Sequence, residues 1–344
     1  MRIKQFALSA TTALLVLGMT GCGSGADEAR PVAEGGWEEI VAAADEEGEV
    51  SFYSVAPQIQ NDRIEAAFKE QYPGITLSIT RGATDLPARV SAELNSGSDG
   101  ADVFLFSDPA WFTEHEEYLL EQPGPAVEGW SDEFWAVDGK SPTAHRGPFS
   151  LFVWNTNLFP DGFDQWDDFL DPSVKGKLAL REGMTPSLAG YLEFMEDRLG
   201  PEYLQALGGQ DPKFYPSTVP MAQAVASGEI GVANTNNISN VKELIERGAP
   251  VDYTVPSPAF ALEFAAGALN TSKRPNAALV FLDFLMSKEG QEALNGDGFG
   301  TSGRDLPDDL ELDDAVVLDS KKYTPDSLAE WKEKFAEYFG RSAG

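Results

Sequence analysis

The alternation of apolar and amphipathic segments between residues 50 and 106 constrains the fold of this chain more than any other feature. Apolar runs in this region predict buried strands, at residues 50–53, 75–80 and 101–108. Between them, apolar side chains recur at helical spacing, at residues 61–72 and 85–94. Strands that alternate with helices in this way predict one half of a doubly wound α/β sheet. Such sheets bind ligands beyond the carboxyl ends of their strands.

Polar residues follow each of the three predicted strands, and we expect them to line a ligand site. The candidates are Ser54, Arg81, Gly82, Thr84, Ser107 and Asp108. Arg81 has two interpretations. It either binds an anionic ligand through both arms of its guanidinium, or it is a surface arginine that happens to follow a strand.

A similar alternation after residue 149 predicts a second sheet, whereas residues 123–146 read as mainly loops. Thr185 precedes Pro186 and is a good amino-terminal helix cap, and the free N–H groups of such a helix start suit an anion. Asn236 and Asn237 follow another predicted strand, where they either bind ligand or hold a turn.

These patterns predict an α/β protein of two doubly wound lobes that are joined by a two-strand hinge. The first lobe is expected to comprise residues 37–148 and about 258–300. The second lobe is expected to comprise residues 149–257 and about 301–344.

The amino terminus indicates a targeting segment. Residues 1–21 combine a basic start with a short apolar core, as signal peptides do. Met19-Thr20-Gly21-Cys22 looks like a lipoprotein processing site, so Cys22 is the expected lipidation site; the alternative is an ordinary secretory signal. Residues 22–36 form a polar tether. We therefore expect an extracytoplasmic body that is lipid-anchored to the cell membrane.

The charge and the rarity of histidine exclude several function classes. With 25 basic and 56 acidic residues, the formal net charge is −31, which disfavours nucleic acid as a partner. An exported hydrolase is a competing hypothesis, because acidic residues are abundant enough for a carboxylate pair. The chain has two histidines and no G-x-S-x-G motif, so other hydrolytic sites have few possible members. His115 lies in an acidic segment that is typical of a solvated helix face.

Several stretches allow a comparison with a known family. They are VSFYS and the later YPGITL, ADVFLFSD, WDDFLDPSVKGKLAL, ASGEIGVAN and AALVFLDFLMSKEGQEAL. In their order and spacing the chain resembles an extracellular solute-binding protein of an ABC importer, with the type II periplasmic-binding-protein fold. It is most similar to the ferric-ion-binding group. The resemblance implies a monomer, without enzymatic activity or cofactor, that captures a small-molecule ligand and delivers it to an ABC permease. A ligand-loaded receptor for a membrane sensor stays an alternative.

The resemblance also implies a site, which this chain matches only in part. Pro57 stands where the ferric-binding group has a histidine, Ser107 where it has a glutamate, and Ile238-Ser239 where it has two tyrosines. The metal ligands are therefore not carried over, and no metal site is expected. The group's anion-binding features are matched at Thr185, Ser187, Ser217, Thr218 and Asn236. The ligand expected is an anionic solute (a phosphonate, phosphate ester or carboxylate) or a ferric complex that brings its own donors. Arg81, Ser107, Ser187 and Asn236 are expected to converge around one cavity.

Overall fold

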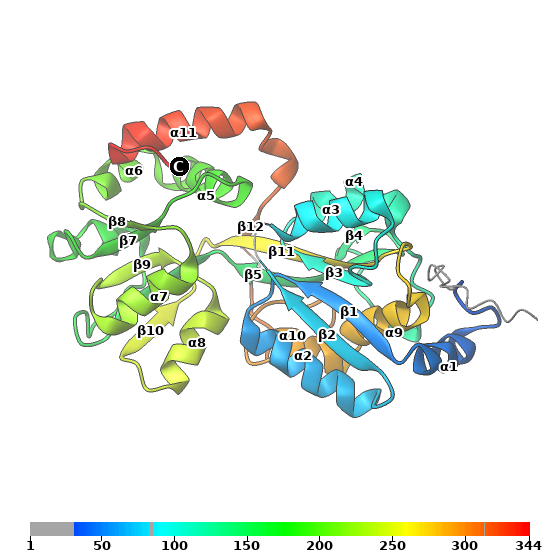
Figure 1. Ribbon diagram of the computed structural model, residues 1–344. Coiled ribbons are helices and arrows are strands. Elements are labelled where there is room, and N and C mark those ends of the chain that lie inside the picture. The colour runs from blue at the N-terminus through cyan, green and yellow to red at the C-terminus, as the bar shows by residue number, and fades with distance from the viewer. Residues whose placement is uncertain (1–30, 83–84, 313) are drawn as a thin grey trace, which may run out of the picture.

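Two separate β-sheets, each covered by helices on both faces, form the two lobes of this protein (Figure 1). The structure is a computed structural model that describes residues 31–82, 85–312 and 314–344. Cys22, most of the predicted tether and Thr84 lie outside the described residues. The predicted α/β fold with two lobes is confirmed.

The first sheet contains the strand pattern that the sequence predicts. β1 (Glu49–Ser54) pairs in parallel with β2 (Thr76–Arg81) and with β3 (Val103–Phe106). The remaining strands of this sheet are β11 (Phe260–Ala268), β5 (Ser141–Pro148), β4 (Trp135–Val137) and β12 (Val316–Val317). β11 runs antiparallel to both β3 and β5, and the strand order is β2-β1-β3-β11-β5-β4, with β12 beside β11. The register aligns Ser54 with both Arg81 and Leu105, so the carboxyl ends of β1, β2 and β3 meet at one edge.

Helices cover both faces of the first sheet. One face packs against α1 (Trp37–Glu47), α2 (Gln58–Gln71), α9 (Pro275–Met286) and α10 (Lys288–Asn295). All residues of α9 are buried, and Phe281 makes edge-to-face contacts with Phe52 and Phe68 from the facing strand and helix. The other face packs against α3 (Leu86–Ser96) and α4 (Pro109–Glu114).

The second sheet has the strand order β10-β6-β9-β7-β8. Its strands are β10 (Val251–Thr254), β6 (Ser150–Asn155), β9 (Val232–Thr235), β7 (Leu178–Arg181) and β8 (Lys213–Tyr215). α5 (Pro186–Leu199), α6 (Pro201–Gly208) and α11 (Pro325–Phe339) pack on one face, and α7 (Thr218–Ser227) and α8 (Ile238–Glu246) pack on the other. Short 3₁₀ turns complete the described structure, at Glu116–Tyr118, Pro125–Val127, Trp166–Leu170, Pro172–Val174 and Ser320–Lys322.

Residues 123–146 contain many turns, as expected, but they also contain β4 and most of β5, which the sequence pattern does not predict. Pro142 within the segment and Gly147 directly after it have a low propensity for strand. β5 nevertheless lies between β11 and β4, and seven of its eight residues are buried. Tertiary pairing here outweighs a poor local propensity for strand.

The chain passes between the lobes three times, at residue 149, at residues 255–259 and at residues 318–324 (Figure 1). The third passage leads from β12 to α11, which packs on α5 and α6. Residues 301–312 precede this passage, and two of them contact the first lobe. Thr301 forms a β-bridge with Arg146, and Arg304 Nε donates to the Met286 carbonyl at 2.6 Å. We therefore propose that the second lobe resumes near residue 318, and we keep the other expected boundaries as a proposal.

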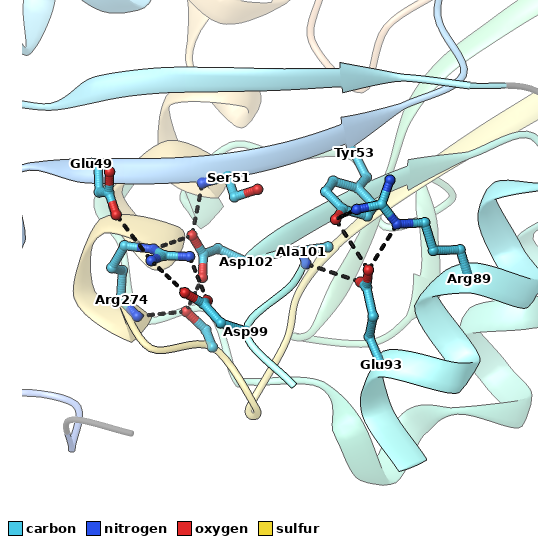
Figure 2. A network of polar contacts seen from close by, with 10 residues as sticks. Glu49, Ser51, Tyr53, Arg89, Glu93, Asp99, Ala101, Asp102 and Arg274 are labelled. Atoms are coloured by element: carbon cyan, nitrogen blue, oxygen red, sulfur yellow. Dashed lines mark hydrogen bonds and ion pairs between the residues drawn. The ribbon is translucent and has the colours of Figure 1, made fainter. Parts of the chain in front are cut away.

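A network of ion pairs fixes the amino ends of β1 and β3 (Figure 2). Arg274, which precedes α9, contacts Asp102 at 2.7 Å, Asp99 at 2.8 Å and Glu49 at 3.0 Å. Asp102 is fully buried and also accepts from the Ser51 backbone N–H at 2.7 Å. Burial raises the pKa of Asp102, although Arg274 opposes this effect. This network joins α9 to the sheet at the edge opposite to the strand ends considered below.

Candidate functional site

A cavity of about 450 Å³ lies between the two lobes, and we call it the interlobe cavity. Its size falls in the range of about 300–1,000 Å³ that is usual for small-molecule sites. The first lobe contributes residues that follow β1 and β3, and the second lobe contributes the segment from the end of β7 to the start of α5. The third passage supplies a further wall. The lining residues are Val55, Phe106, Ser107, Asp108, Arg181, Met184, Thr185, Pro186, Ser187, Leu318 and Ser320.

The wall from the second lobe is the amino terminus of α5. Thr185 caps this helix, as predicted, because its Oγ1 accepts from the Leu188 backbone N–H at 3.3 Å. Ser187 Oγ lies 3.0 Å from Thr185 Oγ1, so two hydroxyl groups stand together at the helix start. The positive end of the helix dipole and these hydroxyls face the same cavity.

Arg181 is the residue that the sequence interpretation missed. It is the last residue of β7, lines the interlobe cavity and is partly buried. Its Nε is buried, and no described residue accepts a hydrogen bond from it. Burial lowers the pKa of Arg181, but a guanidinium stays charged at neutral pH. The signal was present in the sequence, because Arg181 follows a buried strand directly and strand ends of this kind face the crevice.

The wall from the first lobe contains Ser107 and Asp108, as expected. Asp108 caps α4, and its Oδ1 accepts from the Ala110 backbone N–H at 3.0 Å. The same oxygen accepts from the Ser320 hydroxyl, which ties the third passage to the first lobe. Phe106 lies beside these residues and stacks on Phe104, with ring centroids 5.5 Å apart.

Three other candidates in the first lobe do not line the interlobe cavity. Ser54 is fully buried, and its Oγ accepts from the Ala56 backbone N–H at 3.1 Å. Arg81 is exposed, and its Nε donates to the Ala56 carbonyl at 3.1 Å. Gly82 donates its N–H to the Ser54 carbonyl at 3.2 Å, and a side chain here would meet Leu86. These residues shape the turn that presents Val55 and Ala56 to the space between the lobes.

The candidates at the end of β9 and the start of α7 also lie away from this cavity. Asn236 is fully buried, its Nδ2 donates to the Thr218 carbonyl at 3.3 Å, and its Oδ1 accepts from the Asn237 backbone N–H. Thr218 is buried and accepts from Asn240 at 3.2 Å. Ser217 precedes α7 but makes no capping hydrogen bond through its side chain. Of the four residues that were expected to converge, Ser107 and Ser187 share the interlobe cavity, whereas Arg81 and Asn236 do not line it.

Asn237 lines a second, smaller cavity of about 30 Å³ between the lobes, together with Pro57 and His145. His145 lies on β5, four residues before the passage into the second lobe at residue 149, and its Nδ1 is 2.5 Å from Asn295 Oδ1. Burial lowers the pKa of His145 to about 4, so the ring is neutral at physiological pH. Within the described residues, no group of three or more His, Cys, Asp or Glu side chains is arranged to hold a metal ion.

The chain is similar to known binding proteins in both sequence and fold. The family model described as "Bacterial extracellular solute-binding protein" matches residues 54–300. No curated protein matches the chain. Among the helices in the described part of the chain, none is long and apolar enough to cross a membrane.

Three solved structures illustrate the similarity in fold. AfuA, a periplasmic binding protein from Actinobacillus pleuropneumoniae with fructose-6-phosphate bound, is 20% identical, with a TM-score of 0.65 over 86% of this chain and 99% of that one. Iron-bound HitA from Pseudomonas aeruginosa is 20% identical, with a TM-score of 0.63 over 84% and 97%. AgtB from A. tumefaciens R10, in complex with agropinic acid, is 20% identical, with a TM-score of 0.63 over 86% and 99%.

These three proteins share a fold and bind chemically different ligands, so the shared fold does not identify the ligand of this chain. The family match spans most of both lobes and includes the strand ends that surround the interlobe cavity. The chain therefore belongs to the family of bacterial extracellular solute-binding proteins, and it has the type II periplasmic-binding-protein fold of ABC-transporter binding proteins.

Proposed function

We propose that this protein captures an anionic small molecule in the interlobe cavity and delivers it to an ABC importer. The observation that supports this most strongly is Arg181, a partly buried cation whose Nε has no acceptor among the described residues. Taking a charge out of water is costly unless a counter-charge and hydrogen bonds compensate it. Arg181 lines the same cavity as the Thr185 and Ser187 hydroxyls at a helix amino terminus, so an anion is the partner that suits this wall.

Ligand binding is coupled to closure of the lobes, because the cavity has walls on both of them. The second lobe supplies Arg181 and the α5 amino terminus, and the first lobe supplies Ser107 and Asp108. A ligand that contacts both walls favours the closed arrangement over the open one by its additional contacts. Phosphonates, phosphate esters and carboxylates have suitable anionic groups, and a ferric complex with its own oxygen donors is the alternative ligand.

The lining of the cavity supports binding rather than hydrolysis. Among the described residues that line it, Asp108 is the only carboxylate and there is no histidine. A glycosidase needs two carboxylates, and a serine hydrolase needs a base beside its nucleophile. Neither arrangement can be built from these residues.

The remaining parts of the proposal concern location and partners. We propose that Cys22 carries a lipid that anchors the monomer outside the cytoplasm, and that the loaded protein docks on an ABC permease. A receptor that presents its ligand to a membrane sensor would use the same cavity. Metabolic labelling with a palmitate analogue tests the anchor, since Cys22→Ser should abolish both the label and membrane retention.

A panel of solutes tests the proposed ligand class. Thermal shift and titration calorimetry would compare carboxylates, phosphonates, phosphate esters and ferric citrate with neutral sugars and polyamines. The proposal predicts stabilisation by at least one anionic class and none by polyamines. Stabilisation only by neutral or cationic solutes would contradict it.

A further inference from the structure

Two opposite charges face the interlobe cavity from opposite lobes. Asp108 belongs to the first lobe and Arg181 to the second, and they are the only ionisable side chains among the described residues that line this cavity. Resting on the proposed function, we propose that the ligand is a zwitterion, which carries a protonated amine as well as its anionic group. The amine binds Asp108, and the anionic group binds Arg181 and the amino terminus of α5.

Asp108 has a free acceptor for such an amine. Its Oδ1 accepts both hydrogen bonds that described residues donate to this carboxylate, from the Ala110 backbone and from Ser320. These bonds fix the orientation of the carboxylate and leave Oδ2 for a ligand. The Ser107 hydroxyl offers a second acceptor, and the Phe106 ring supplies a surface on which a cation is also favoured.

The chemistry of this wall suits an ammonium group better than a metal ion. A ferric ion requires several hard oxygen donors, and one carboxylate cannot supply them. An ammonium group needs one negative charge and up to three acceptors. The side chains that line the cavity also include Val55, Met184 and Leu318, whose apolar surfaces favour a short carbon chain between the charged ends of the ligand.

A zwitterion would also make closure depend on both of its charges. An anion without an amine satisfies Arg181 on the second lobe but gives Asp108 on the first lobe no cationic partner. A ligand that carries both groups gains contacts only when the lobes approach each other. The anionic group therefore provides binding, and the amine provides selectivity.

Matched pairs of ligands test this inference by titration calorimetry with the intact protein. β-Alanine is compared with propionate, and 2-aminoethylphosphonate with ethylphosphonate, together with homologous pairs of two to five carbons between the charged groups. One charge-assisted hydrogen bond predicts that the amine raises affinity by about 10- to 100-fold in the best pair. Asp108→Asn keeps a good helix cap and should bring the two affinities of that pair together. Glu114→Gln, on the exposed side of the same helix, makes the same change of charge and should preserve their ratio.

The possible results separate this inference from the proposed function. If anions bind equally well with and without the amine, the zwitterion is wrong and the anion site stands. If Asp108→Asn keeps the full preference for the amine, Asp108 is not its partner and the inference is likewise overturned. Tight binding of ferric citrate without any preference for amines would also overturn it. If no anion of either kind binds, the proposed function itself fails.

Discussion

Replacing Arg181 with methionine should stabilise the ligand-free protein and weaken ligand binding. Arg181 has a buried Nε without an acceptor among the described residues, so the ligand-free protein holds a charge that is incompletely compensated. Arg181 has a long apolar stem, and it also lines a third, mainly apolar cavity together with Leu188, Phe335 and Phe339. Methionine is unbranched and flexible, and it can fill the space of that stem without carrying the charge.

The structure gives the size of both effects. Leaving a buried polar group unpaired costs about 1–3 kcal/mol. Because Arg181 is only partly buried, we expect the lower end, so that Arg181→Met raises the free energy of unfolding by about 1 kcal/mol. A hydrogen bond to a charged group contributes about 1.5–3 kcal/mol, so the anionic ligand should bind roughly 10- to 100-fold more weakly. A gain in stability together with a loss in ligand affinity is expected where a residue is retained for function at a cost in stability.

Urea denaturation without ligand and calorimetry with ligand would measure the two effects. Arg198→Met makes the same substitution at an exposed position in the last turn of α5 and serves as the control, with both quantities nearly unchanged. A destabilised Arg181→Met protein that binds its ligand with full affinity would refute the reasoning. Arg181 would then be a structural residue.

Three further predictions concern the frame around the site. Burial lowers the pKa of His145 from 6.5 to about 4. The neutral ring therefore contributes fully to the free energy of unfolding above pH 6.5, and this contribution is lost as the pH falls through 4. The difference between the two pKa values corresponds to about 3 kcal/mol. Urea denaturation should therefore show the wild type losing about that much more than His145→Gln between pH 7.5 and pH 3.5, and a pH-independent difference would contradict this. Arg274→Gln leaves Asp102 buried without its cation and should cost about 3 kcal/mol in the same assay, whereas a loss below 1 kcal/mol would mean that the network in Figure 2 contributes little. Gly208→Ala would place a methyl group 2.1 Å from the Tyr338 carbonyl oxygen, and this overpacking should lower the free energy of unfolding by about 1–3 kcal/mol. An unchanged free energy of unfolding would mean that α11 does not pack on α6 as described.

The strongly periodic segments of the fold could be predicted from the sequence. The run of three strands and two helices in the first lobe, α9 and the Thr185 cap all follow from local patterns that agree with the tertiary structure. β5 could not be predicted from local patterns, because its prolines and glycine indicate a loop. Only its pairing with β11 and β4 makes it a strand. The third passage between the lobes follows an acidic segment without periodicity, so no local pattern marks it.

The candidate site could be predicted only at the level of strand ends. Ser107, Asp108, Thr185 and Ser187 line the cavity, as residues that follow strands or begin a helix are expected to do. Asn236 also follows a strand, yet it uses its amide to hold its own loop. The direction of a side chain at the end of a strand depends on such local hydrogen bonds, which the sequence pattern does not contain. Arg181, at the end of β7, is a different case, because the rule for strand ends applied to it and would have identified it.

A crystal structure of the protein with its highest-affinity ligand tests the central claim most directly. We expect the anionic group of the ligand to lie within hydrogen-bond distance of the Arg181 guanidinium and of the Thr185 or Ser187 hydroxyl, with both lobes in contact with the ligand. A ligand that is bound elsewhere, or one that occupies the cavity while Arg181 stays without an acceptor, would contradict the account.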